Sequence, residues 1–595
     1  MKRIQLIALI FLFTSAKVVY AQQKADLIIT NGKVITIDEN MPFAEAIAIA
    51  GNKIIMVGSS KEVLKLKTSK TRVVDAKKRT VTSGIYDSHL HVIRGGRFYN
   101  TELRWDGVKT LRRALTMLSE QAKRTPEGQW VRVVGGWSEY QFEEKRLPTM
   151  DEINEATGAT PAFILHLYGQ AMLNKAGIER LGITGDTPNP TGGLFQKDAN
   201  GKPTGLLVAE PNALILYSTL AKLPELTHEE QVNSTQQFIS ELNSLGVTSV
   251  MDAGGGFQNF PDDYAITNEL AVKNQLNIRL PYYLFAQKPG SELKDFLSWM
   301  NMVDIVEHSG DHDAGIKVDY FVQGGGENLV SSAGDFENFT KPRPELSALM
   351  EPQLKAVIMQ FVKKRWPFRL HATYNESIDR FLSVIEEVNK EVPLNGLTWF
   401  FDHAETISEL NMDRVKALGG GISVQDRMAF QAETFIARYG KASAQNTPPI
   451  KKMLAKGLRV GGGTDGTRVA SYNPWIGIYQ FVTGRSVGGT LFSGEENLLD
   501  RISALRLYTT GSASLIHQET TRGMLKKGYL ADIIILSDDY LNIPADQIKE
   551  LHALLTIVNG DVVYGSGEYE TYQPARASAI PAWSPVNFYG GYQKL

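Results

Sequence analysis

Short apolar runs separated by turn dipeptides characterise both ends of the chain. The N-terminal runs are Leu27–Ile29, Val34–Ile37 and Ala46–Ile49, punctuated by Asn31-Gly32 and Gly51-Asn52. Such dipeptides tolerate positive φ and mark hairpins. The same pattern of short apolar runs and turn dipeptides occurs again only near the C-terminus, where Ala531–Leu536 and Ala553–Val558 precede Asn559-Gly560. The pattern predicts one small, sandwich-like β-domain built from both chain ends.

The middle of the chain instead alternates apolar strand runs with amphipathic helical stretches. The predicted strands are Val81–Asp87, Gly246–Asp252, Arg279–Leu284, Gly315–Phe321, Pro367–His371, Thr398–His403, Gly420–Val424 and Leu458–Thr464. Eight strand-then-helix units predict an α/β fold, namely a (β/α)₈ TIM barrel rather than an open sheet. The first two strands are separated by about residues 93–245, which is too long for one crossover and predicts an insertion.

The first residues have the features of a secretory signal peptide. A basic start, Met1-Lys2-Arg3, is followed by the apolar run Ile4–Ala16 and by Val19-Tyr20-Ala21 before Gln22. The run is too short to span a bilayer comfortably, so we expect cleavage and export to the periplasm or medium. The alternative is an uncleaved N-terminal anchor. No later segment offers a long apolar run, so we expect no membrane span.

These patterns divide the chain into four parts. The predicted parts are a signal peptide over residues 1–21, a composite β-domain of residues 22–82 and 520–570, a barrel over residues 83–519, and a C-terminal arm over residues 571–595. The arm is rich in Pro, Gly and aromatic residues and lacks a helical period. It is therefore either a packed irregular segment or a frayed end.

The amino-acid composition excludes several classes of protein and of metal site. The 595 residues carry 63 Lys and Arg against 65 Asp and Glu, a net charge of −2, and 43% are hydrophobic. This balance argues against a nucleic-acid partner and against a disordered chain. The absence of Cys excludes disulfides, cysteine zinc sites, iron–sulfur clusters and thiol nucleophiles. Any metal must be held by His, Asp, Glu or a modified Lys. Oligomeric state stays open, a homo-oligomer included.

Candidate metal ligands gather at the ends of the predicted strands. His89 and His91 close the first strand and, because side chains alternate along a strand, project to the same side. Taken alone, that pair is as compatible with hydrogen-bonded core histidines as with a metal site. His371, His403 and Asp465 close the fifth, sixth and eighth strands. Barrel active sites are assembled from such ends, and imidazole with carboxylate suits zinc or a similar divalent ion.

The motifs around these residues resemble those of the amidohydrolase superfamily, specifically its YtcJ-like (amidohydrolase-3) metal-dependent hydrolases. The similarity covers about residues 26–567. The segments that carry it are Val81–His91, Gly135–Glu139, Asn189–Gly193, Gly201–Gly205 and Gly523–Asp532. Ser83 stands where the family usually has Pro.

The resemblance implies a ligand set and roles. His89 and His91 would bind one metal, and His371 and His403 a second metal or a shared centre. Lys317, which lies within the predicted fourth strand, would be carboxylated and would bridge two ions; alternatively, its ammonium pairs with a carboxylate such as Asp319. Asp465 would contact the metal and take the proton from its bound water.

The implied reaction is hydrolysis of an amide or other non-peptide C–N bond of a small-molecule substrate. Hydrolysis of an ester or lactone by the same water activation, and a non-catalytic ligand-binding role, stay open as alternatives. Segments that face the pocket in the family depart from its pattern here, notably Phe321–Glu327 after the fourth strand and Tyr168-Gly169-Gln170 in the insertion. Substrate preference is therefore not transferable. The pocket candidates, each also compatible with ordinary packing, are Trp137, Tyr168, Gln170 and Arg427.

Overall fold

The computed structural model describes residues 23–210, 213–303, 316–327, 329–330, 335 and 346–593. The predicted signal peptide lies outside these residues. Among the helices in the described ranges, none is both long and apolar enough to cross a bilayer.

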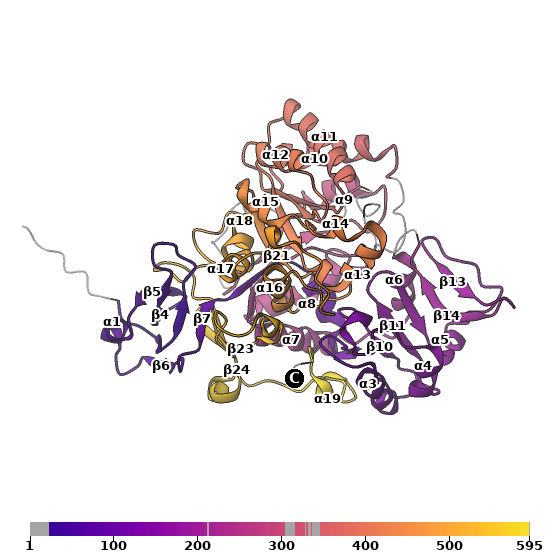
Figure 1. Ribbon diagram of the computed structural model, residues 1–595, viewed down its shortest axis with the longest axis horizontal. Coiled ribbons are helices and arrows are strands. Elements are labelled where there is room, and N and C mark those ends of the chain that lie inside the picture. The colour runs from indigo at the N-terminus through magenta and orange to yellow at the C-terminus, as the bar shows by residue number, and fades with distance from the viewer. Residues whose placement is uncertain are drawn as a thin grey trace, which may run out of the picture.

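The centre of the molecule is an eight-stranded parallel barrel (Figure 1), which confirms the predicted fold class. Its strands, in chain order, are β8 (Ile85–Leu90), β15 (Val247–Asp252), β16 (Leu280–Leu284), β17 (Tyr320–Gly325), β18 (Phe368–Ala372), β19 (Trp399–His403), β20 (Gly421–Gln425) and β21 (Arg459–Gly463). Spatial order follows chain order, as expected for repeated right-handed βα units. The first and last strands meet where the Asp465 N–H donates to the His89 carbonyl over 2.7 Å.

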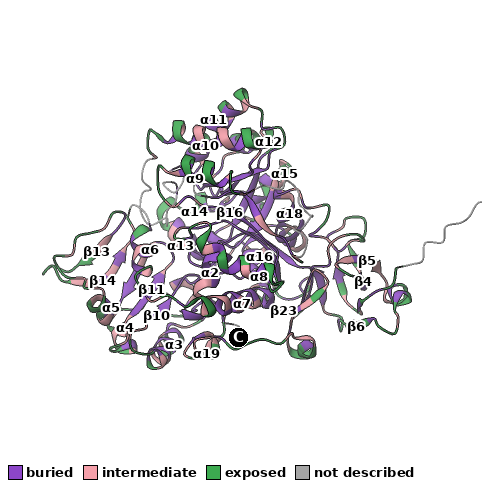
Figure 2. Cartoon of the chain, turned by 180° about the vertical axis from the view of Figure 1, so that it is seen from behind, coloured by how far each residue is buried: buried purple, intermediate pink, exposed green. Residues whose placement is uncertain are grey.

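Amphipathic helices cover the outside of the barrel, with buried inner faces and exposed outer faces (Figure 2). The helices that follow β15 to β21 include α8 (Ala265–Val272), α9 (Glu292–Trp299), α10 (Met350–Lys364), α11 (Asn375–Glu391), α12 (Glu409–Ala417), α13 (Arg427–Tyr439) and α16 (Pro474–Thr483). In α11 the buried residues Ile378, Phe381, Leu382 and Ile385 recur at helical spacing, so the sequence period itself selects the face that packs on the sheet.

The fourth barrel strand lies further along the chain than the sequence pattern predicts. The prediction was Gly315–Phe321, whereas β17 spans Tyr320–Gly325. A strand that ends in glycines looks like a turn in sequence. Here the glycines are required, because a Cβ at Gly324 would lie 2.0 Å from the carbonyl oxygen of Pro367. This shift decides which residue reaches the site.

Both chain ends contribute to the β-structure beside the barrel. One sheet has the order β24-β23-β22-β7-β2-β3 and joins β7 (Thr80–Ser83) antiparallel to β22 (Ile533–Leu536). Its other strands are β2 (Lys33–Ile35), β3 (Phe43–Ala44), β23 (Ala553–Val558) and β24 (Asp561–Gly565). The second sheet contains β5 (Lys53–Gly58), β4 (Ala46–Ala50), β1 (Leu27–Thr30) and β6 (Arg72–Asp75). The predicted division of the chain into domains stays a prediction.

The segment between β8 and β15 forms a separate six-stranded sheet at one side of the barrel (Figure 1). Its strands are β9 (Glu102–Leu103), β10 (Val131–Val133), β11 (Ala162–His166), β12 (Gln170–Leu173), β13 (Leu194–Lys197) and β14 (Pro203–Val208). The accompanying helices are α3 (Leu111–Arg124), α4 (Met150–Thr157), α5 (Lys175–Arg180) and α6 (Leu214–Leu220). The chain leaves and re-enters the barrel through α2 (Val92–Phe98) and α7 (His228–Ser244).

The C-terminal arm packs against the protein in its described part. Asn233 of α7 donates to the Ser578 carbonyl, and Gln121 of α3 donates to the Trp583 carbonyl. The Tyr592 N–H donates to Glu241 over 2.8 Å. The arm is therefore the packed irregular segment of the two predicted possibilities, and it ties α7 to the insertion.

Candidate metal centre

The structure brings the four predicted histidines and Asp465 together at the carboxyl end of the barrel. His89, His91, His371, His403 and Asp465 are all at most 4% exposed. The ring centroids of His89 and His403 are 5.3 Å apart, and those of His371 and His403 are 4.3 Å apart. The Asp465 carboxylate lies 3.2 Å from Nε2 of His91. Parallel strands therefore assemble one cluster from residues that are up to several hundred positions apart.

Glu327 completes this cluster, although it is not one of the ligands that the sequence pattern predicts. Its Oε1 lies 2.9 Å from Nδ1 of His371 and 3.1 Å from Nε2 of His403. Its Oε2 lies 3.7 Å from Nε2 of His89. The signal that could have identified it is its position, since it is the first carboxylate after the glycines that end β17.

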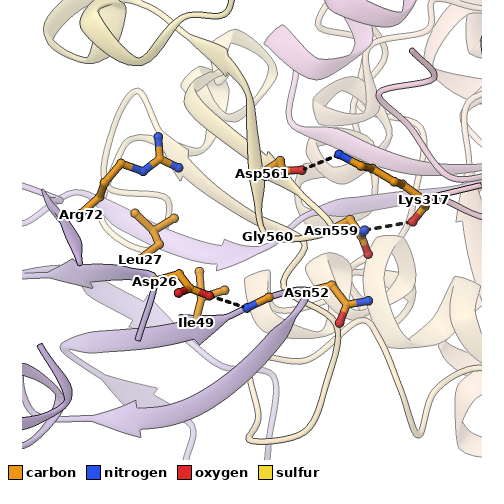
Figure 3. A pocket seen from close by; sticks show the side chains of 10 residues that line it. Asp26, Leu27, Ile49, Asn52, Arg72, Lys317, Asn559, Gly560 and Asp561 are labelled. Atoms are coloured by element: carbon orange, nitrogen blue, oxygen red, sulfur yellow. Dashed lines mark hydrogen bonds and ion pairs between the residues drawn. The ribbon is translucent and has the colours of Figure 1, made fainter. Parts of the chain in front are cut away.

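Lys317 lies elsewhere, and its selection as a bridging ligand was wrong. Its side chain is 64% exposed and its ammonium lies 3.9 Å from Asp561 (Figure 3). Its carbonyl accepts from Asn559, and it lines a surface pocket of about 450 Å³ beside the β-domain. The physical reason is the strand shift, because Lys317 precedes β17 and so sits at the amino end of the barrel. The alternative partner was also wrong, since Asp319 contacts Arg279 and Arg522.

The donor atoms of this cluster fit a divalent metal. Three overlapping groups have ligand atoms within 4.8 Å of one another: His89 with His403 and Asp465, His89 with His91 and Glu327, and His371 with His403 and Glu327. Nε2 of His89 is buried and has no hydrogen-bond partner among the described residues. A buried nitrogen acceptor without a donor is costly unless a cation binds it. Imidazole nitrogens and carboxylate oxygens are suitable ligands for such an ion.

Outer contacts orient the ligand imidazoles. Nδ1 of His89 lies 3.0 Å from Asp402, whose carboxylate accepts from Nε of Arg369 over 2.9 Å. Nη2 of Arg369 lies 2.7 Å from the same imidazole nitrogen. Nδ1 of His91 contacts the Gly254 carbonyl. When Nδ1 of His91 carries the proton and donates it to the Gly254 carbonyl, Nε2 is left as the metal-binding nitrogen of that ring. Nδ1 of His89 faces both an acceptor, Asp402, and a donor, Arg369, and its Nε2 faces the other ligands.

Electrostatics favour a positive charge among the carboxylates. Burial lowers the pKa of His89, but Glu327 and Asp402 outweigh burial and raise it to about 10. Burial and the Arg427 guanidinium lower the pKa of His403 to about 3. Burial opposes ionisation of Asp465, yet His89 and His91 hold its pKa well below the usual range. The cluster thus stabilises a cation, and a divalent ion supplies that charge.

The four pocket candidates have different surroundings. Arg427 is fully buried beside the site, with Nη2 3.2 Å from Nδ1 of His403 and Nε 3.5 Å from Glu405. Trp137 packs within the insertion, where its indole N–H donates to the Leu165 carbonyl over 2.9 Å. Gln170 begins β12 and pairs with its neighbouring strands. Tyr168 accepts a hydrogen bond from Tyr217 over 2.6 Å.

A barrel with histidine and carboxylate ligands at its strand ends defines the class of metal-dependent hydrolases with this architecture. Residues 72–564 match the profile of the amidohydrolase family. The chain belongs to the amidohydrolase family and is a metal-dependent hydrolase.

Three relatives span most of the chain. A putative amidohydrolase, YtcJ, of Bacillus subtilis is 24% identical over 550 residues, 90% of this chain and 98% of its own. An N-substituted formamide deformylase of Arthrobacter pascens is 24% identical, covering 91% of this chain and 99% of its own. The crystal structure of an uncharacterised metal-dependent hydrolase from Pyrococcus horikoshii shares the fold, with a TM-score of 0.61, 21% identity, and coverage of 87% and 99%.

Asp402→Asn is expected to lower metal affinity by about 10- to 100-fold, the usual cost of removing an outer partner of a ligand. The amide cannot balance the charge of Arg369 and no longer fixes the His89 tautomer. Competition with a chelator of known affinity measures the change. Asp538→Asn at the surface serves as the control, and equal affinity in the two variants would contradict the role of Asp402.

Proposed function

We propose that this protein uses one or two zinc ions to hydrolyse an amide or other non-peptide C–N bond of a small molecule. The observation that carries the proposal is the convergence of four histidines and two carboxylates on one buried site, where Nε2 of His89 has no partner among the described residues. The absence of Cys leaves only nitrogen and oxygen donors, which zinc accepts. A relative named for deformylation of N-substituted formamides supports a C–N substrate.

The residues divide into those that hold the ion and one that moves a proton. A divalent ion, when bound, lowers the pKa of water from ~16 to ~7 and polarises a carbonyl. His89, His91, His371, His403 and Glu327 would hold it. Asp465 lies within 3.4 Å of the nearer nitrogens of both His89 and His91, so its carboxylate can accept a proton from water and return it to the departing amine.

Buried positive charge keeps Asp465 ready to accept that proton. Burial raises the pKa of Asp465, but His89, His91 and His403 hold it well below the usual range, and Nη2 of Arg427 lies 4.0 Å from its Oδ2. The carboxylate is therefore ionised when the substrate binds. Because Asp465 has a backbone φ of 54°, its side chain leaves β21 through a left-handed turn toward the histidines. His403 also lies in this region, with a φ of 76°.

Metal removal should abolish hydrolysis and lower the melting temperature by several degrees, because a ligand that binds only the folded state stabilises it in proportion to its occupancy. Dialysis against a chelator, elemental analysis and differential scanning calorimetry measure both effects. Zinc should restore activity and melting temperature together. A fully active protein without metal would refute the proposal.

A matched panel of amides and esters identifies the bond that is cleaved. N-formyl and N-acetyl amines should be hydrolysed with higher kcat/KM than esters of the same acyl and alkyl groups. The reverse preference would favour the esterase or lactonase alternative. Ligand binding without turnover in the zinc-loaded protein would favour a binding role.

We propose further that the protein is exported and begins at Gln22 in its mature form. The support is the basic and apolar start of the chain followed by Val19-Tyr20-Ala21. Expression with the native N-terminus, cell fractionation and N-terminal sequencing should find Gln22 first in the periplasm or medium. Full-length protein in the cytoplasm would contradict the proposal.

A further inference from the structure

Two buried arginines lie next to the metal centre. Arg94 follows His91 by three positions and Arg468 follows Asp465 by three. They are 3% and 5% exposed. A Cβ at Gly255 would lie 2.8 Å from Nη1 of Arg94 and 3.5 Å from Nδ1 of His91, so the Arg94 guanidinium and a ligand imidazole are neighbours. Arg94 therefore reaches the site, and Arg468 follows the segment that carries Asp465.

Neither arginine has a carboxylate partner within the part of the chain that the structure describes. Nε and Nη2 of Arg94 are buried and without a hydrogen-bond partner there, whereas its Nη1 donates to the Tyr217 hydroxyl over 3.3 Å and its guanidinium group also interacts with the Tyr168 phenol. The nearby carboxylate of Asp252 instead accepts the backbone N–H groups of Ile93 and Gly254. Unpaired buried cations are costly, which makes these arginines unusual in a folded protein.

The phenol between the two arginines does not neutralise them. The guanidinium carbons of Arg468 and Arg94 lie 4.6 and 5.5 Å from the ring centroid of Tyr217. The Tyr217 hydroxyl in turn donates to Tyr168 over 2.6 Å. Cation–π contact stabilises such charges only partly. Burial and the neighbouring Arg94 lower the pKa of Arg468, which reflects the repulsion between the two cations.

The other arginines beside the metal centre have carboxylate partners. Asp402 is paired with Arg369, and the Glu405 carboxylate lies 3.5 Å from Arg427. Glu327 and Asp465, the two carboxylates among the candidate ligands, match the charge of one divalent ion. Arg94 and Arg468 differ from these arginines, because no described carboxylate is paired with either guanidinium group.

The surroundings of the arginines are otherwise apolar and aromatic. Arg468 lines a small cavity together with Phe163, Leu165, Tyr168, Leu216, Tyr217 and Leu220. Tyr217 also stacks on Phe257, with ring centroids 5.7 Å apart, and Phe257 is 41% exposed. The cavity has a volume of about 10 Å³, room for no more than a water molecule. The hydrocarbon part of a ligand would therefore lie against the stacked and partly exposed Tyr217 and Phe257.

We propose that Arg94 and Arg468 bind a carboxylate of the substrate, so that the scissile C–N bond and an anionic group on an apolar body belong to the same small molecule. The proposal rests on the proposed hydrolytic function for the identity of the bond. Paired guanidinium groups recognise carboxylates through charge-assisted, bidentate hydrogen bonds. An anion there pairs with the two guanidinium groups, which a neutral amide of the same shape does not.

Binding of benzoate and of benzamide tests the arginines without any turnover. Calorimetry on chelated and on zinc-loaded protein should show benzoate bound about 10-fold or more tightly than benzamide, the effect of a charge-assisted bond. The preference should persist in chelated protein and weaken with salt. Equal affinities, or a benzoate preference that disappears on chelation, would overturn the proposal, the latter because the ion would then be the binding group.

Single substitutions distinguish a loss of the arginine side chain from a loss of the fold. Arg94→Gln and Arg468→Gln should each weaken benzoate about 10-fold or more and leave benzamide unchanged. The benzoate affinity of Arg94→Lys should lie between those of the parent protein and Arg94→Gln, because lysine keeps the charge and lacks the planar guanidinium group. Arg112→Gln, on the exposed face of α3, is the matched control. Near-ultraviolet circular dichroism checks folding, and unchanged benzoate affinity in both Gln variants would overturn the assignment.

Rates of hydrolysis then show how far the substrate carboxylate lies from the scissile C–N bond. N-formylglycine, N-formyl-β-alanine and N-formyl-4-aminobutyrate are compared with their carboxamides. For one of the three spacer lengths, the acid should be hydrolysed with a kcat/KM at least about 10-fold above that of its carboxamide. In Arg94→Gln the acid and its carboxamide should have equal kcat/KM values. Benzoate selectivity without hydrolysis of any amide would contradict the proposed function and keep the anion site, whereas hydrolysis of carboxamides and acids at equal rates would contradict the anion site alone.

Discussion

Glu327→Gln is expected to lower metal content and to reduce kcat/KM by about 100-fold or more. Loss of a residue that only supports a metal ligand costs about 10- to 100-fold, and loss of a candidate ligand should cost at least the upper end of that range. The reason is geometric, because one carboxylate lies within 3.7 Å of His89, His371 and His403. The amide has the same size and no charge, so it cannot offset the charge of bound ions. Elemental analysis and steady-state kinetics measure the two effects.

Lys317→Met is the matched control for that experiment. If Lys317 lies in the surface pocket beside Asp561 (Figure 3), its loss should leave metal content and kcat/KM unchanged. A bridging carboxylated lysine predicts the opposite pattern, with Lys317→Met inactive and Glu327→Gln active. The pair of variants therefore decides between the two carboxylates directly.

Asp465→Asn is expected to reduce kcat by about 10²- to 10⁴-fold, the usual contribution of general acid–base catalysis. Asn is the appropriate replacement because Asp465 has a φ of 54°, a region that Asn tolerates and that would strain Ala. The fold and the histidine ligands should therefore be retained. Stopped-flow or steady-state assays measure kcat, and elemental analysis measures the metal.

The pH profile distinguishes a proton acceptor from a purely structural ligand. In the parent enzyme kcat should fall at low pH as Asp465 becomes protonated, and this acidic limb should disappear in Asp465→Asn. Asp561→Asn, at the opposite end of the barrel, should leave the profile unchanged. A variant that keeps both its rate and its acidic limb would remove Asp465 from the proton transfer.

The barrel and the clustering of most candidate ligand residues could be predicted because both depend on short-range patterns. Six of the predicted strands overlap β15, β16, β18, β19, β20 and β21 along most of their length, and Val81–Asp87 covers the end of β7 and the first half of β8. In each, a run of apolar residues with a helix behind it identifies a buried parallel strand. Histidines at the ends of such strands must then meet, since parallel strands end at one edge. Fold and ligand histidines therefore follow from local sequence.

The carboxylate between the histidines could not be predicted in the same way. Lys317 precedes β17 and Glu327 follows it. The position of this strand along the chain therefore decides which of the two residues faces the site. Its glycines weaken the strand pattern in sequence, and they are required because the Pro367 carbonyl and the Phe361 ring pack against them. That requirement comes from segments that are distant along the chain.

By itself the sequence determined the α/β barrel, the nitrogen-and-oxygen character of the metal site, and the positions of His89, His91, His371, His403 and Asp465. Only the tertiary structure selected Glu327 over Lys317 and placed Arg94 beside Arg468 with Tyr217 between them. The physical reason is that strand period and composition are local, whereas charge balance depends on side chains that meet from distant segments. The arrangement of charges around the site is therefore decided by packing.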